Sequence, residues 1–306
     1  MNINRFRVLA VVLGGVFVAA CSSDGEDPIM GGKEQNVVKS SIAISRATAD
    51  GGFQFSGGDA IGLYMVNYAG STAGSIGNAS DLQIANRQLV YGQQSTTSGD
   101  YHTEFYWKDS QTNADFIAYY PYMASVTNPS AYKFTLNATS VHANDFLWGM
   151  TSNVKPTASA ISLQMKHLFS LIDIKIVYGE GFENSDESTV ASVSLKEFPE
   201  SAVINLGTGA LTPDMAALKT LPAFKQSDSA WQAVVIPHSR STMTGGQLIV
   251  VETAKDSFVL KNDPDMTFES GKKYTATLTL DKTAGGINIG IGSWDVVDED
   301  FGGTVN

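Results

Sequence analysis

Apolar and polar residues alternate most regularly in the stretch Lys166-His-Leu-Phe-Ser-Leu-Ile-Asp-Ile-Lys-Ile-Val177. Its isoleucines share one parity with Leu168, whereas Asp173 and Lys175 take the other. Successive side chains of a β-strand point to opposite faces, so this alternation predicts a strand with one buried face and one solvated face.

The same two-residue period recurs along most of the chain, with breaks rich in glycine, serine, threonine and asparagine. It predicts further strands over residues 61–65, 101–107, 115–121, 230–236, 247–252, 257–260, 273–280 and 286–294. Helical periodicity is nearly absent, and only Asp214 to Leu221, after Thr212-Pro213, is expected to form a short helical turn. Many short strands separated by turns indicate an all-β protein built from β-sandwiches.

A polar join that contains a proline, Ser152-Asn-Val-Lys-Pro-Thr-Ala-Ser159, lies near the middle of the chain. Exposed, polar segments of this kind are typical of the connections between domains. We therefore expect two β-sandwich domains in tandem, over residues 47–156 and 157–306.

Residues 1–20 have the composition of a signal peptide. Arg5 and Arg7 precede an uncharged apolar run from Val8 to Ala20, which is too short to span a bilayer. The run ends in small residues immediately before Cys21, the only cysteine. This arrangement resembles a bacterial lipobox, in which the cysteine is lipidated and becomes the first residue of the mature protein. A plain secretory signal also ends in small residues, but it would leave Cys21 as an unpaired thiol.

The segment after the cysteine, Ser22-Ser-Asp-Gly-Glu-Asp27, is short and acidic. It resembles the acidic export tag that Bacteroidetes lipoproteins carry when they are moved to the cell surface. A solvated tether is the alternative interpretation. Both interpretations place the lipidated precursor at the outer membrane, and the first predicts exposure on the cell surface.

Composition narrows the classes of partner. Apolar residues make up 43% of the chain, which is enough for a sizeable core. Without Arg5 and Arg7 the basic count falls from 20 to 18 against 31 acidic residues, a net charge of −13. Such a surface repels phosphate backbones, so nucleic acid is a poor candidate partner. A single cysteine leaves no disulfide and no thiolate metal site.

Enzyme signatures are missing from the sequence. It has no nucleophile elbow, no phosphate-binding glycine loop with a lysine, and no pair of histidines at zinc-binding spacing. The segment Asn205-Leu-Gly-Thr-Gly209 has no lysine and is interpreted as a turn between strands. The histidines are scattered singly and are expected to pack or cap strands rather than to catalyse; they are His102, His142, His167 and His238.

Two further clusters have a functional and a structural interpretation. Asp298-Glu-Asp300 could suggest calcium, but it lacks the spacing of a dedicated loop and is interpreted as a solvated tail. Phe116-Ile-Ala-Tyr-Tyr-Pro-Tyr122 could form a platform that stacks on sugars, or its alternate rings could fill the sandwich core. We favour the core, and we expect no metal, no cofactor and no enzymatic activity.

Six short motifs follow one another along nearly the whole chain. They are Arg46 with Gly58-Asp-Ala-Ile-Gly-Leu-Tyr64, Asp115-Phe-Ile-Ala-Tyr-Tyr-Pro121, Asp145-Phe-Leu-Trp-Gly-Met150, the strand at His167, Val235-Ile-Pro237, and Phe268-Glu-Ser-Gly-Lys-Lys-Tyr274. In this order, on a lipoprotein chain, they resemble the fimbrillin family of Bacteroidales, in its minor-fimbrillin-like branch. The resemblance implies two transthyretin-like β-sandwiches in tandem.

The resemblance also implies a mode of assembly. In that family a trypsin-like protease cuts the surface precursor after an arginine or lysine and removes the first strand. A strand from another subunit then fills the groove, which is a form of β-strand addition. Residues 21–46 would then be a tether and a removable strand, with Ile42 and Ile44 on one face and cleavage between Arg46 and Ala47. An ordinary surface arginine in a linker is the alternative.

At the other end of the chain, Ile287, Ile289 and Ile291 alternate with Asn288 and glycines. The pattern fits a strand donated to a neighbour, and equally a final core strand. We favour the core strand, because Trp294 is a large apolar anchor, and therefore a tip subunit, which accepts a strand but need not donate one.

Two functions are thus open at this stage. The first is a structural subunit of a surface fimbria that supports adhesion and biofilm formation. Its partners would be other fimbrial subunits, the outer membrane through the precursor's lipid, and ligands on host or bacterial surfaces. The second is a monomeric glycan-binding surface lipoprotein that uses Tyr119 to Tyr122.

Overall fold

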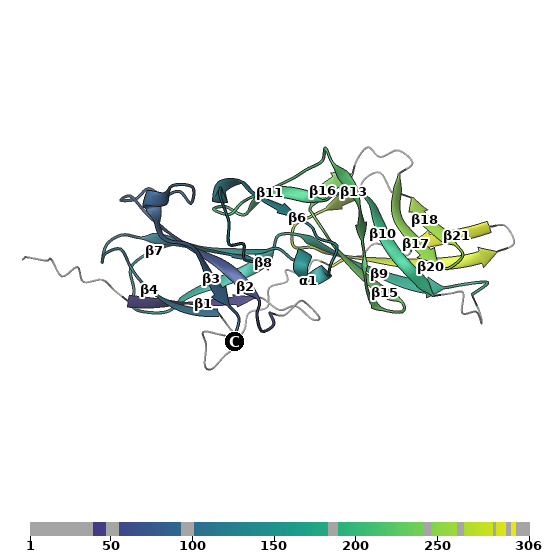
Figure 1. Cartoon of the computed structure of the whole chain (residues 1–306), viewed down its shortest axis with the longest axis horizontal. Helices are drawn as coiled ribbons and strands as arrows, with labels where there is room; N and C mark the ends of the chain where they lie inside the picture. The colour runs from purple at the N-terminus through teal and green to yellow at the C-terminus, as the bar shows by residue number, and fades with distance from the viewer. Residues whose placement is uncertain are drawn as a thin grey trace, which may run out of the picture. The chain divides into compact units, whose positions relative to one another are not determined.

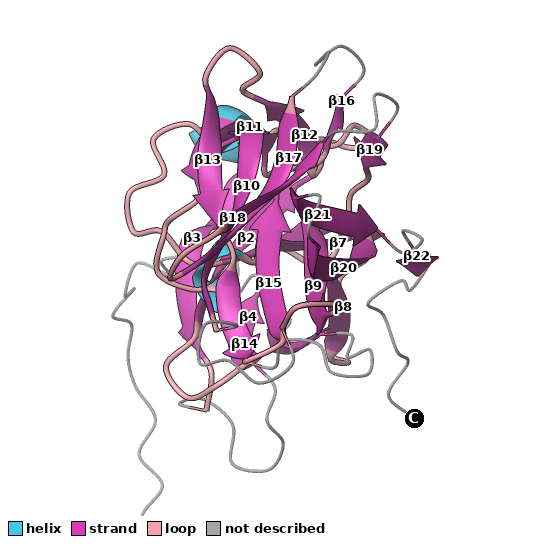
Figure 2. Cartoon of the chain, turned by 90° about the vertical axis from the view of Figure 1, so that its right-hand side faces the viewer, coloured by secondary structure: helices cyan, strands magenta, loops and turns pink. Residues whose placement is uncertain are grey.

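The computed structural model describes residues 39–46, 55–92, 101–182, 189–240, 246–261, 266–283, 286–291 and 295–297. Within these ranges, side chains are described for 55–92, 103–182, 189–240, 246–261 and 266–281. Cys21, Ala47 and Asp298 to Asp300 lie outside the described residues. Strands are the main regular structure of the described part, as Figure 2 shows, so the all-β class is confirmed.

Seven of the first eight strands form one sheet, in the order β3-β2-β5-β7-β8-β1-β4. Their bounds, with that of β6, are β1 Lys39–Arg46, β2 Ala60–Asn67, β3 Leu82–Val90, β4 Tyr101–Tyr106, β5 Ala114–Tyr120, β6 Tyr132–Thr135, β7 Leu147–Val154 and β8 Ile161–His167. Strand β8 joins two parts of this sheet: residues 161–165 pair with β1, and 166–167 pair with β7. A core of aromatic and aliphatic side chains from β2, β3, β4, β5, β7 and β8 fills the space between the two parts.

The remaining strands form four smaller sheets, whose orders are β14-β15-β9-β20-β21 with β22 on β20, β13-β10-β17-β18, β12-β11-β6, and β16-β19. Their bounds are β9 Ser170–Tyr178, β10 Val190–Pro199, β11 Ser201–Asn205, β12 Ala210–Pro213, β13 Leu218–Pro222, β14 Phe224–Ser227, β15 Ala230–Val235, β16 His238–Arg240, β17 Gln247–Thr253, β18 Ser257–Lys261, β19 Met266–Phe268, β20 Lys273–Thr283, β21 Gly286–Ile291 and β22 Asp295–Val297. Side chains of β9, β10, β15, β17, β18 and β20 form a second core. Figure 1 shows these strands near one another.

Strands β2 and β5 are buried on both faces, which explains why they read as nearly continuous apolar runs. One face of each contributes to the first core, through Leu63 and Phe116 for example. The other face contributes to the second core, through Tyr64 of β2 and Tyr119 of β5. This core also includes side chains of β6 and β11. Burial raises the pKa of the Tyr119 phenol, because the charged form loses its solvation there.

Helical structure is confined to single turns among the described residues. They are the 3-10 turns Ala79–Asp81 and Pro129–Ala131 and the α-turn α1, Val141–Asn144. The helical turn expected between Asp214 and Leu221 is wrong. Residues 218–222 form β13 instead, because Leu221 pairs with Leu195 of β10 and is buried there. No helix of the described residues is long and apolar enough to cross a membrane.

The stretch from Lys166 to Val177 is not one strand. It ends β8 at His167, bends at Leu168 and Phe169, and continues as β9 in a different sheet. The bend is held by the Leu168 amide, which donates to the carbonyl of Phe146 at 2.8 Å. The change of sheet therefore falls at residues 168–169, whereas the expected boundary at 156 lies between β7 and β8 of the first sheet. The division into two domains stays a prediction.

Candidate strand-exchange site

Strand β1 contains the segment expected to be removable, and it lies inside a sheet rather than at an edge. It pairs antiparallel with β4 over residues 39–44 and parallel with β8 over residues 42–46. The register places Ile42 beside Thr103 and Ile161, and Ile44 beside Tyr101 and Leu163. Removing β1 would therefore leave main-chain groups without partners on both neighbours.

The neighbours of β1 present a buried apolar row. Ile161, Leu163 and Met165 alternate with exposed residues along β8 and are each at most 5% exposed. On β4, Phe105 is 4% exposed and packs its ring against Phe116 of β5, with ring centroids 5.1 Å apart. A gap between β4 and β8 would thus be polar along its backbone edges and apolar along its floor, which is the surface that an added strand requires.

Arg46 is the last residue of β1 and pairs with Met165 of β8. The described chain resumes at Phe55, so the bond between Arg46 and Ala47 lies at the boundary of the described residues. The position agrees with a cut that separates the whole of β1 from the rest of the chain. Cleavage there, like lipidation of Cys21, stays a prediction.

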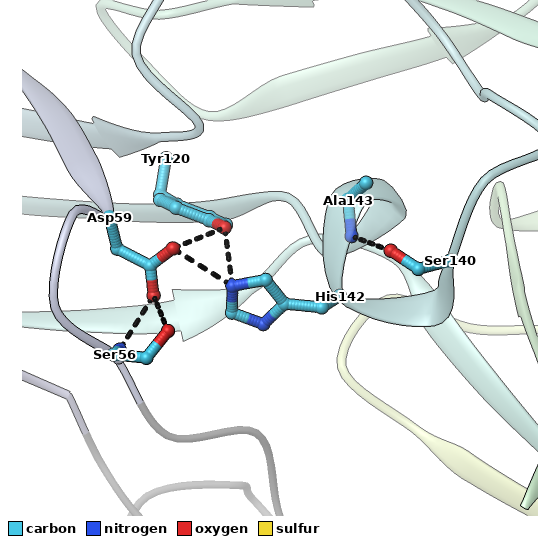
Figure 3. A network of polar contacts seen from close by, with 6 residues as sticks. All are labelled: Ser56, Asp59, Tyr120, Ser140, His142 and Ala143. Atoms are coloured by element: carbon cyan, nitrogen blue, oxygen red, sulfur yellow. Dashed lines mark hydrogen bonds and ion pairs between the residues drawn. The ribbon is translucent and has the colours of Figure 1, made fainter.

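A polar network surrounds Asp59, which immediately precedes β2 (Figure 3). The carboxylate Oδ1 lies 2.9 Å from His142 Nε2 and 3.3 Å from the Tyr120 hydroxyl, and these two groups are 2.8 Å apart. The other oxygen accepts a 2.8 Å hydrogen bond from the amide of Ser56. Burial by itself raises the pKa of Asp59, but the hydrogen bonds from His142, the Ser56 amide and Tyr120 outweigh it, so the pKa is lowered.

A second carboxylate and histidine meet at the junction of β7 and β8. Asp145 Oδ1 lies 2.5 Å from His167 Nδ1, and both side chains are almost completely buried. These two networks bring together residues from three of the motifs, at Asp59, Asp145 and His167. Sequence reasoning treated each histidine singly and missed both carboxylate partners, which lie 83 and 22 positions away from them.

Of the other residues considered in the sequence, His238 and the segment from Asn205 to Gly209 have structural roles. His238 is buried between the rings of Phe198 and Phe268, and its Nδ1 lies 2.8 Å from the carbonyl of Ile236. His238 is therefore a packing residue, as expected, and burial lowers the pKa of its ring. Asn205 to Gly209 form the turn between β11 and β12, also as expected. The side chain of His102 is outside the described ones.

The aromatic platform is absent from the described surface at Tyr119 and Tyr120. Tyr119 is fully buried and Tyr120 is 5% exposed. The Tyr119 ring stacks on Phe146 at 6.2 Å, and its hydroxyl donates to the side chain of Asn86 at 2.8 Å. The interpretation as core is confirmed for Tyr119 and Tyr120, whereas Tyr122 is half-buried. Among the described residues there is also no cluster of three or more histidine, cysteine or acidic side chains that could hold a metal ion.

The C-terminal isoleucines lie in β21, an edge strand that pairs antiparallel with β20. Ile287, Ile289 and Ile291 pair in register with Lys282, Leu280 and Leu278. Strand β22 pairs with the beginning of β20. The backbone of residues 286–291 therefore belongs to the chain's own sheet in this structure. Among the described residues, no strand pairs with the other side of β21 in that sheet.

Comparison with known proteins agrees with this architecture. The fimbrillin-like family model matches residues 45–294. A candidate fimbrium subunit, Fim1C of Bacteroides uniformis, is 22% identical over 298 residues, with 94% of each chain covered.

Two solved structures share the fold. A candidate cell adhesion protein from B. uniformis has a TM-score of 0.65 at 19% identity and covers 88% of this chain and 99% of its own. Another from Bacteroides ovatus has a TM-score of 0.57 at 16% identity, with coverages of 85% and 98%. Because the family model spans most of its length, the chain belongs to the fimbrillin-like family, whose members are structural proteins of fimbriae and not enzymes.

Proposed function

We propose that this protein is a fimbrial subunit that becomes competent for assembly when β1 is cut away after Arg46. The observation that carries the proposal is the place of β1 between β4 and β8, with Arg46 as its last residue. Cleavage at that point frees an inner strand, and the gap it leaves matches one extended strand of another subunit. An edge or surface strand would leave no such gap.

The energetics favour refilling over an open gap. Loss of β1 would uncover apolar side chains of β4 and β8, among them Phe105 and Leu163, which are now buried. Covering each such side chain again is worth roughly 1.5–3 kcal/mol. The unpaired backbone groups add the cost of lost hydrogen bonds. A donor strand from another subunit meets both demands, and its alternate side chains set the register.

The precursor is proposed to reach the cell surface as a lipoprotein. Cys21 carries the lipid, and the acidic residues that follow it form a tether to the outer membrane. Cleavage after Arg46 would release the folded part from this anchor at the same moment that it opens the gap. A single cut thus couples release to assembly, and the mature subunit would support adhesion and biofilm formation in the fimbria.

Within the fimbria we place the protein at the tip rather than in the shaft. Both β21 and β22 pair with β20 in the chain's own sheet, along the same edge. A subunit that keeps its C-terminal strands in place accepts a strand without donating one. The glycan-binding alternative is the weaker one, because Tyr119 and Tyr120, two of the three tyrosines of the supposed platform, are buried and Tyr122 is half-buried.

The test is digestion of the purified full-length precursor with an arginine-specific protease. After the signal only three arginines remain: Arg46, Arg87 and Arg240. Arg240 is 3% exposed in β16, where its Nη1 donates to the carbonyls of Lys196 and Glu197, and Arg87 lies within β3. We expect an early cut after Arg46 and, in size-exclusion chromatography, separation of the excised segment from a folded remainder that begins at Ala47.

The matched control is Arg46→Lys, which blocks the arginine-specific protease but leaves a bond that trypsin cuts. This variant should stay whole in the first digestion and release β1 in the second. Fimbrial material from the cell surface should likewise begin at Ala47. N-terminal sequences that consistently begin at Cys21, or a cleaved segment that never leaves the folded remainder, would contradict the proposal. If the cleaved protein formed a series of oligomers on a gel without any other subunit, the protein would be a shaft subunit and not a tip subunit.

A further inference from the structure

The gap left by β1 would have two walls, β4 on one side and residues 161–165 of β8 on the other. Both walls depend on β1 for their backbone pairing. Among the described residues, β4 pairs through its backbone with β1 alone, and residues 161–165 of β8 do the same. Without β1, neither wall would have a ladder to hold its distance from the other. Two strand spacings, about 9.5 Å, must nevertheless remain open for a new strand to enter. Something other than the ladder has to hold the walls apart.

Side chains of β3 hold the outer edge of β4. Gln83 Nε2 donates to the carbonyl of Tyr106, and Arg87 Nη1 donates to the carbonyl of Glu104, each at 3.3 Å. Gln83 is itself fixed from β2, because Asn67 Nδ2 donates to its Oε1 at 3.3 Å. Alternate residues of a strand direct their main-chain groups to opposite sides. The intervening residues of β4 therefore direct theirs toward β1.

The outer edge of β8 is held in the same manner from β7. Thr151 Oγ1 donates to the carbonyl of Ser162 at 2.9 Å, where no backbone ladder joins the two strands. Gly149 allows this approach, because a Cβ at its position would lie 2.3 Å from the carbonyl oxygen of Gln164. On both walls, side-chain donors thus bind carbonyls that point away from β1.

A fourth contact ties one wall to the other. Trp107 follows β4 directly, and its indole Nε1 donates to the carbonyl of Thr157, four residues before β8, at 3.1 Å. The ring is 1% exposed and packs edge-to-face on Phe116 with centroids 5.6 Å apart. This tie does not pass through β1. It fixes the separation of the walls at the end where β1 begins.

We propose that Gln83, Arg87, Thr151 and Trp107 are positioning residues that keep the gap between β4 and β8 open after β1 has left. This inference rests on the proposed function, because it assigns the means by which the emptied site stays ready for its partner. That partner is an extended strand of another fimbrial subunit, which enters a preformed slot instead of waiting for the walls to separate. In the precursor the four contacts add little to the positioning of β4 and β8, because the backbone pairing with β1 already holds both strands.

The experiment compares the full-length protein with the double variant Gln83→Ala/Arg87→Ala and with the control Gln88→Ala, an exposed neighbour on the same strand. Each protein is cut after Arg46 and the excised segment is removed. The rate at which the cleaved protein then binds a fluorescent synthetic peptide of residues 36–46 is measured. Two side-chain hydrogen bonds correspond to a factor of roughly five to thirty. We expect uptake by the double variant to be slower by about that factor, and uptake by the control to match the wild type.

The same proteins are also melted before cleavage. The uncut double variant should melt within about 2 °C of the wild type, because β1 still braces β4 there; a defect that appears only after cleavage identifies positioning rather than general support. An equal loss of stability before and after cleavage would overturn the inference, and so would unchanged uptake. Arg87→Lys, which keeps a donor, should recover part of the rate. Failure of the cleaved wild type to take up the peptide would instead refute the proposed function on which the inference rests.

Discussion

Replacing Gly149 by alanine should force β7 and β8 apart. A Cβ at this position would lie 2.3 Å from the carbonyl oxygen of Gln164 and 2.9 Å from its carbon, so it falls 0.7 Å short even of a 3.0 Å contact. Both obstructing atoms belong to backbone and cannot rotate away. Overpacking of this kind costs about 1–3 kcal/mol of unfolding free energy. For a domain of 150–250 residues, that corresponds to a melting temperature lower by roughly 2–12 °C.

The assay is urea unfolding followed by tryptophan fluorescence, with thermal melts as a second measure. The matched control is Gly57→Ala, because no atom lies within 4 Å of a Cβ there and the backbone needs no left-handed conformation. That control should be neutral or more stable by up to about 1 kcal/mol, since alanine restricts the unfolded chain. If Gly149→Ala unfolds within about 0.5 kcal/mol of the wild type, the close approach of β7 to β8 is not the constraint inferred here.

Three further predictions follow from the site. The pKa of Asp59 is lowered in the folded state, so its contribution to stability is present above about pH 4 and is lost as the pH falls through the folded pKa. Asp59→Asn should therefore be less stable than the wild type at pH 6 and should lose less stability between pH 6 and pH 3. Urea unfolding at several pH values tests this, and a free energy of unfolding that changes equally with pH in both proteins would contradict it. Cys21→Ser should lack acyl mass on its N-terminal peptide and leave the outer-membrane fraction, whereas normal retention would refute the lipoprotein assignment. Truncation after Gly285 removes β21 and β22 from β20 and should lower the melting temperature of the monomer; a truncated monomer of full stability that no longer polymerises would identify a donated strand and a shaft subunit.

Local patterns predicted about half of the strands of the described residues, those in which the pattern has a local cause. Where one face of a strand is buried, as in β8, side chains alternate and the period of two is visible in the sequence. The prediction failed where two strands are nearly continuous in sequence. The bend at Leu168 and Phe169 does leave a trace, because the buried residues are odd-numbered in β8 and even-numbered along most of β9, but the prediction overlooked this change of phase. The short β13 was missed because its burial depends on pairing with β10.

In the candidate strand-exchange site, too, the sequence predicted some features, and others depend on pairing between distant residues. Composition and motif order in the sequence indicated a non-enzymatic fimbrillin-like chain with a first strand that ends in an arginine. The parallel pairing of that strand with β8, about 119 residues further along at Ile42 and Ile161, is invisible to any local pattern. The partners of His142 and His167 were equally out of reach, because a histidine finds its carboxylate through the fold and not through spacing.

Amphipathic alternation, glycine-rich turns and a single cysteine after an apolar leader are properties of neighbouring residues, so the sequence by itself determined the all-β class, the likeness to fimbrillins and the predicted anchor. Tertiary structure alone decided that β1 is an inner strand, that β2 and β5 are buried on both faces, and that Gln83, Arg87, Thr151 and Trp107 converge on the walls around it. These properties depend on which distant segments pair, and pairing is settled by the burial of whole faces and the satisfaction of backbone groups across the sheet.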